Sequence, residues 1–83
     1  MMTEQELKDT LQKLPLRVAS VRIEGRPGHL VAQVVSPDFK DQDESVRQQT
    51  IWEFLMSELT DDQRVQVEFV FTFTPEEAQE AAA

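Results

Sequence analysis

The nine residues from Val65 to Phe73 constrain the fold more than any other segment of the chain. They read VQVEFVFTF, and every second position is apolar: Val65, Val67, Phe69, Phe71 and Phe73. Successive side chains of a β-strand point to opposite faces of a sheet, so this alternation predicts a strand with one strongly apolar face. An apolar face of this kind has to be covered, and we therefore expect helices to pack on it.

Two amphipathic segments supply these helices. Residues 3–6 read TEQE, the pattern of a capping box, and predict a helix over about 4–14 with a leucine face of Leu7, Leu11 and Leu14. Residues 45–48 read SVRQ, a second capping box with Asp43 as a competing cap, and predict a helix over about 44–59. We expect its apolar stripe to lie in the core: Ile51, Trp52, Leu55, Met56 and Leu59.

Two β-type runs, 17–24 and 29–36, flank the segment Gly25-Arg26-Pro27-Gly28. Glycine and proline supply the backbone angles of a tight turn, so the runs form an antiparallel hairpin. The third strand returns after a helix and joins the sheet in parallel, and Thr74-Pro75 begins a last helix. The predicted fold class is α+β: a two-layer α-β-β-α-β-α sandwich whose three-stranded mixed sheet is covered by helices on one face.

Length and composition limit the classes of function. The 83 residues predict a single domain over 1–83, with an ordered core over about 4–76 and a C-terminal tail that frays. The absence of cysteine excludes disulfides, thiolate metal sites and cysteine nucleophiles. No apolar run reaches about 20 residues and the N-terminus has no signal-peptide core, so we expect a cytoplasmic protein with no membrane contact. The net charge of −8 argues against a polyanionic partner.

The hairpin turn carries the candidate binding residues. Arg17, Arg22 and Arg26, against Glu24, make this the only locally basic region of the chain, and the candidate binding residues are Arg22, Arg26 and His29. His29, the single histidine, is a candidate metal ligand, although alone it makes an incomplete site; the alternative is an ordinary strand histidine. Gly25 and Gly28 also form a GxxG pattern, but KH domains use GxxG between two helices, whereas here it lies between strands. For this reason we do not expect nucleic-acid binding. We also do not expect an enzyme, because no acid–base constellation is visible.

Three segments in this order resemble the BolA family. They are HLVAQVVSPDF (29–39), VRQQTIWEFLMSEL (46–59) and VQVEFVFTFTPEE (65–77), and the resemblance covers about residues 4–80. It implies a class II KH-like fold and, as a partner, a monothiol glutaredoxin with which family members share a 2Fe-2S cluster. Some family members are described as transcriptional regulators.

The resemblance also implies two cluster ligands, and this chain departs from both. The family has a histidine near the start of the last strand, where this chain has Val65-Gln66. It has a cysteine or histidine in the loop between the first two strands, where this chain offers only His29, at the end of the loop. We therefore interpret the chain as a divergent member without the C-terminal-strand histidine. We expect no cofactor of its own, and a cluster shared with a partner would need His29.

Three functions remain open at this stage. The first is a BolA-like binding or adaptor module for a protein partner, linked to iron-sulfur or redox regulation. The second is a KH-like nucleic-acid-binding domain. The third is a structural protein that dimerises through a sheet edge or the phenylalanine strand, and we expect a monomer or a weak homodimer.

Overall fold

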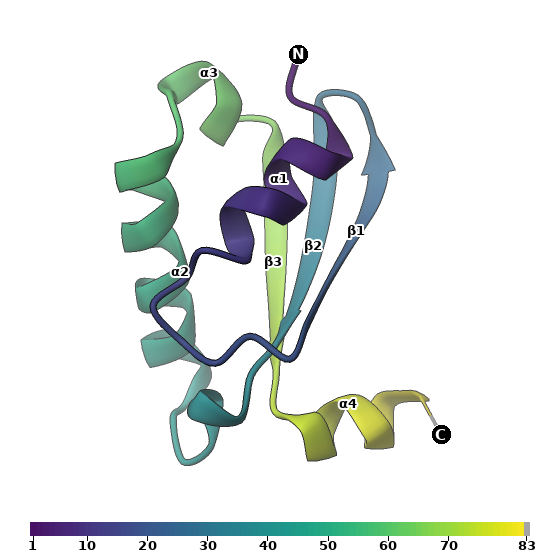
Figure 1. Ribbon diagram of the computed structural model, residues 1–83, viewed down its shortest axis with the longest axis vertical. Helices are drawn as coiled ribbons and strands as arrows, with labels where there is room; N and C mark the ends of the chain where they lie inside the picture. Colours follow the sequence, from purple (N-terminus) through teal and green to yellow (C-terminus); the bar gives the residue numbers. More distant parts are fainter. Residues whose placement is uncertain (83) are drawn as a thin grey trace.

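The computed structural model describes residues 1–82 of the chain (Figure 1). Its elements are α1 (Glu4–Leu11), β1 (Ser20–Arg26), β2 (His29–Val35), the 3-10 turn η1 (Pro37–Phe39), α2 (Glu44–Glu58), α3 (Asp61–Arg64), β3 (Val67–Phe73) and α4 (Pro75–Ala82). The sheet order is β1-β2-β3; β1 and β2 are antiparallel, and β2 and β3 are parallel. The predicted α+β fold with a mixed sheet is confirmed. The C-terminal tail was expected to fray up to Ala83, and this last residue lies outside the described part of the chain. No helix within residues 1–82 is long and apolar enough to cross a membrane.

The core lies between the sheet and the two helices that were predicted to cover it. In Figure 1, α1 crosses the strands and α2 runs beside β3. The leucines of α1 and three residues of the α2 stripe, Ile51, Leu55 and Leu59, are buried in one cluster with alternate residues of β2. The completely buried members of this cluster include Leu7, Leu11, Ile51, Leu55, Ala32 and Val34. Burial of each leucine or isoleucine stabilises the fold by roughly 1.5–3 kcal/mol. Leu14 is also buried, although α1 already ends at Leu11.

The predicted orientation of the phenylalanine strand was wrong. Val67, Val70 and Thr72 face the helices, whereas Phe69 and Phe71 are 41% and 43% exposed on the opposite, open face of the sheet. The cause is a register shift: Leu30 pairs with Val67, but its neighbour Val31 pairs with Phe69. One extra residue in β3 therefore interrupts the ladder, and a single added residue reverses which side chains face the core.

The helix starts follow the predicted capping chemistry with one correction. The side chain of Asp43, and not of Ser45, caps α2, because Asp43 Oδ1 accepts hydrogen bonds from the Val46 N–H and the Ser45 hydroxyl at 3.1 and 2.7 Å. The capping box of α1 is present as predicted. Within α2, Trp52 is half-buried, but Met56 is 62% exposed, so its expected place in the core was wrong.

A buried arginine joins α2 to three other segments. Arg47 is 7% exposed. Its Nε donates to the Gln42 carbonyl at 3.0 Å, and its Nη1 donates to the Thr72 carbonyl at 3.4 Å and to Glu77 Oε1 at 2.7 Å. The guanidinium also lies 5.6 Å from the ring centre of Phe39, within the range of a cation–π contact. Arg47 therefore holds the end of β3 and the start of α4 against α2.

Three surface carboxylates accept enough hydrogen bonds to lower their pKa values. The main cause is the Arg17 side chain for Asp38, the Ser45 hydroxyl for Asp43 and the Arg47 guanidinium for Glu77. Hydrogen bonds to the ionised form favour it, so all three groups remain charged well into the acidic range. We refer to them below as the low-pKa carboxylates.

Candidate binding site at the hairpin end

The turn between β1 and β2 has two residues, Pro27 and Gly28, and closes on the pair Arg26–His29. Proline followed by a glycine at φ 85° matches a type II turn. Gly25 also has a positive φ, 113°, and a Cβ at this position would collide with the backbone carbonyl of His29. Both glycines are thus required by the backbone, and the GxxG pattern joins two strands, as the sequence indicated.

Arg26 and His29 are exposed and lie together at this end of the sheet. They line a shallow hollow of about 380 Å³ with Gly25, Val31 and Glu68. His29 Nδ1 is 3.3 Å from Glu68 Oε2, and both side chains are about half exposed. Arg26 forms no ion pair with any residue in the described part of the chain. The arrangement offers a cation, an imidazole and a carboxylate on an open surface, which suits contact with another macromolecule better than enclosure of a small one.

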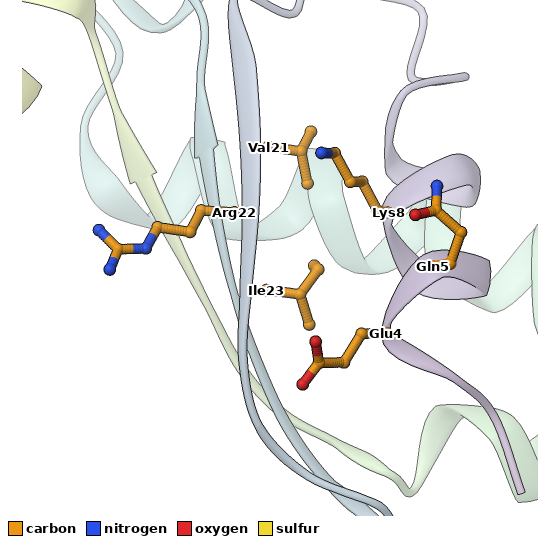
Figure 2. Close-up of a pocket in the computed structure, with 6 residues that line it drawn as sticks. All are labelled: Glu4, Gln5, Lys8, Val21, Arg22 and Ile23. Atoms are coloured by element: carbon orange, nitrogen blue, oxygen red, sulfur yellow. The ribbon is translucent and has the colours of Figure 1, made fainter.

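The third predicted binding residue, Arg22, is not part of this cluster. It lies four residues before Arg26 in β1 and pairs with Glu24, with Nη2 and Oε1 3.0 Å apart. Figure 2 shows its side chain leaving β1 on the side opposite α1, away from Val21 and Ile23. The structure therefore brings two of the three predicted residues together and leaves Arg22 in the middle of the strand.

Sequence reasoning did not identify Glu68 as the partner of His29. Because β2 and β3 are parallel, the start of β3 lies beside the start of β2. The predicted parallel pairing therefore indicated that residues at the start of β3 would lie near His29, but not which of them. The register shift at Leu30 and Val31 places Glu68 at the unpaired position, and neither strand pattern shows that shift.

The residues at this end do not fit a 2Fe-2S cluster. The structure does set Gln66 beside His29, because the Leu30 N–H donates to the Gln66 carbonyl at 2.8 Å. The Gln66 side chain, however, is a carboxamide with both ends occupied: Oε1 accepts from Met2 N, and Nε2 donates to the Asp62 carbonyl, each at 2.9 Å. No cluster of three histidine, cysteine, aspartate or glutamate side chains suited to a metal occurs among residues 1–82. The chain contributes at most one nitrogen ligand, His29.

The fold has close counterparts among solved structures. No protein-family model and no curated protein matches the chain. A BolA protein homologue from Coxiella burnetii is 27% identical, with a TM-score of 0.72 over 95% of this chain and 99% of the other. BolA1 from Arabidopsis thaliana is 20% identical, with a TM-score of 0.70 over 93% and 98%. A Bol-like protein from Babesia bovis is 17% identical, with a TM-score of 0.61 over 100% and 96%. The last two similarities bear on the fold alone.

Proposed function

The chain belongs to the BolA-like family, and from this premise we propose that it is a non-enzymatic binding module whose partner is a protein. The observation that carries the proposal is the exposed hairpin end, where Arg26 and His29 project beside the position at which the family has a cluster ligand. The partner to which the family resemblance points is a monothiol glutaredoxin. Iron-sulfur or redox regulation would then reach this chain through that partner.

The surface at the hairpin end supports contact through side chains. Arg26 has no intramolecular ion pair within the described chain, so no existing interaction has to be broken when it binds. Arginine is enriched at the energetic centres of protein interfaces. On a chain with a net charge of −8, this basic point also orients an acidic partner surface toward the hairpin.

Since Gln66 replaces the family's histidine, we propose that the complex forms through protein contacts without a cluster ligand from β3. The Gln66 amide instead holds the N-terminal segment through Met2 and the first turn of α3 through Asp62. In this proposal His29 hydrogen-bonds to the partner, and its pairing with Glu68 orients the imidazole.

The test is a calorimetric titration of the chain with a cluster-free monothiol glutaredoxin. We expect binding that weakens about ten-fold in Arg26→Glu and in His29→Ala, the loss expected for one polar contact of about 1.4 kcal/mol. Lys13→Glu is the matched control for charge, because Lys13 is exposed and lies outside the hairpin. Absence of binding at several hundred micromolar glutaredoxin, or equal affinities of all variants, would contradict the proposal.

A second measurement addresses the cluster directly. Iron and sulfide are added anaerobically to the equimolar mixture, and its visible absorption is compared with that of glutaredoxin alone. We expect no change in the spectrum with this chain, because Gln66, directly before β3, supplies only a carboxamide. A new spectrum that disappears in His29→Ala would show that cluster sharing persists through His29.

A further inference from the structure

The two edges of the sheet differ in protection. The outer edge of β3 is closed by α2, since Gln48 Nε2 donates to the Val70 carbonyl at 2.8 Å and Arg47 reaches the Thr72 carbonyl. The outer edge of β1 has no such cover. Beside it lies a groove of about 280 Å³ between the strand and α1, shown in Figure 2. An uncovered edge strand is a template for pairing with another strand.

The hairpin geometry identifies the backbone groups that face this open edge. In a two-residue hairpin the closing pair, here Arg26–His29, is hydrogen-bonded, and hydrogen-bonded residues then alternate along the strand. Every second residue of β1 therefore bonds to β2, while Val21, Ile23 and Gly25 turn their N–H and C=O groups outward. Within the described chain, no side chain and no other element donates to or accepts from the backbone of these three residues.

We propose that the chain forms a homodimer in which β1 pairs antiparallel with β1 of a second copy, centred on Ile23. In this register Arg22 lies opposite the partner's Glu24, and Glu24 lies opposite the partner's Arg22. Opposite charges directly across an antiparallel pair are favourable, and like charges are unfavourable. The strand is thus complementary to itself in charge.

The same charges exclude the neighbouring registers. Outward backbone groups can pair only with outward groups. Val21, Ile23 and Gly25 of one copy must therefore lie opposite residues of this same set in the other copy, which limits the possible registers. The nearest alternatives are centred on Arg22 or on Glu24, and each places like charges opposite one another. Only the register centred on Ile23 pairs both charges favourably.

The groove beside β1 can receive the partner strand. Directly opposite residues in an antiparallel pair point to the same face, so the partner's Ile23 and the partner's Val21 face the helix side of the sheet. There they extend the row formed by Val21 and the half-buried Ile23, against the groove wall that α1 supplies with Glu4, Gln5 and Lys8 (Figure 2). A pairing of two seven-residue strands is a small interface, so the dimer is weak and depends on concentration.

Sedimentation of the chain alone, from about 5 µM to about 1 mM, tests the proposal over the range of a weak dimer. We expect a concentration-dependent dimer that weakens at least about ten-fold in Arg22→Glu and in Glu24→Arg, since each change places like charges opposite one another. The double variant Arg22→Glu/Glu24→Arg regains complementarity, so its dissociation constant should return to within about three-fold of the original. An equimolar mixture of the two single variants should form a heterodimer for the same reason.

The variants leave the monomer fold intact, because Arg22 and Glu24 are 71% and 53% exposed, and circular dichroism checks this. Lys13→Glu changes the net charge as Arg22→Glu does and should leave the dimer unchanged. A monomer at every concentration overturns the proposal, as does a dimer indifferent to either single reversal. Amide chemical shifts that change with concentration should lie on β1. A response confined to Phe69 and Phe71 would instead place the interface on the open sheet face and overturn the proposal.

Discussion

Replacement of Arg47 by alanine should destabilise the fold far more than removal of a geometrically similar arginine at the surface. Arg47 and Arg17 each bind a carboxylate, Glu77 and Asp38 respectively, with a shortest N–O distance of 2.7 Å. The difference is burial: the Arg47 side chain is 8% exposed and that of Arg17 is 76% exposed. Comparison of the two variants therefore isolates the effect of burial on a pair of the same length.

The expected magnitude follows from the groups that lose their partner. In Arg47→Ala the carbonyls of Gln42 and Thr72 each lose a hydrogen bond from a charged donor. The loss costs about 1.5 kcal/mol at Gln42 and somewhat less at Thr72, where the contact is longer. The contact with the Phe39 ring adds about 0.5–1 kcal/mol. Together these losses come to about 3 kcal/mol. The total stability of a chain of this size is about 4–12 kcal/mol, so the variant approaches the unfolding threshold.

Urea unfolding followed by the fluorescence of Trp52, which lies on α2, measures this effect. With an m-value of about 1–1.5 kcal/mol per molar urea, Arg47→Ala should lower the midpoint by about 2–3 M. Arg17→Ala should shift it little, because a surface pair is screened by water. Arg47→Lys should fall between the two, since one ammonium group cannot reach all three acceptors in the geometry of a guanidinium. A loss below about 1 kcal/mol for Arg47→Ala would refute the assigned role.

Three further predictions address the turn, the face of β3 and the low-pKa carboxylates. Gly25→Ala should cost about 2 kcal/mol because it combines a positive φ with a collision at the His29 carbonyl; Gly28→Ala, which meets only the Met1 side chain, should cost about 1 kcal/mol in the same urea assay. Val70→Ala should lower stability by about 2 kcal/mol, whereas Phe71→Thr should change thermal stability by less than half as much. A larger effect of Phe71→Thr would mean that the phenylalanines, and not Val70, face the helices. The low-pKa carboxylates stabilise the fold above their ordinary pKa values, so urea midpoints measured from pH 7 to pH 2 should stay constant to about pH 4 and then fall as the groups protonate.

The sequence allowed correct prediction of features that depend on neighbouring residues. The capping box of α1, its leucine face, the Pro27–Gly28 turn and the order of the strands and longer helices each depend on interactions within one or two turns of chain. The parallel placement of β3 followed from the helix that precedes it, since chain connections obey general rules of handedness and crossover.

The candidate site was predictable only in part for the same reason. Arg26 and His29 were identified because the turn between them is a local feature. The pairing of His29 with Glu68, and the position of Gln66 beside His29, come from contacts between segments more than 35 residues apart in sequence. The separation of Arg22 from that cluster likewise follows from the length and direction of β1 in the folded hairpin.

By itself, the sequence determined the three strands and the helices α1, α2 and α4, where these helices begin, and how the hairpin turns; the short helix α3 was not predicted. The tertiary structure alone decided which face of β3 is buried, that Arg47 lies inside, and that the β1 edge is open while the β3 edge is closed. The physical reason is that alternation specifies two faces but not which of them meets the helices. A single unpaired residue opposite β2 reversed that choice, and it depends on the register between strands, which no pattern within one strand records.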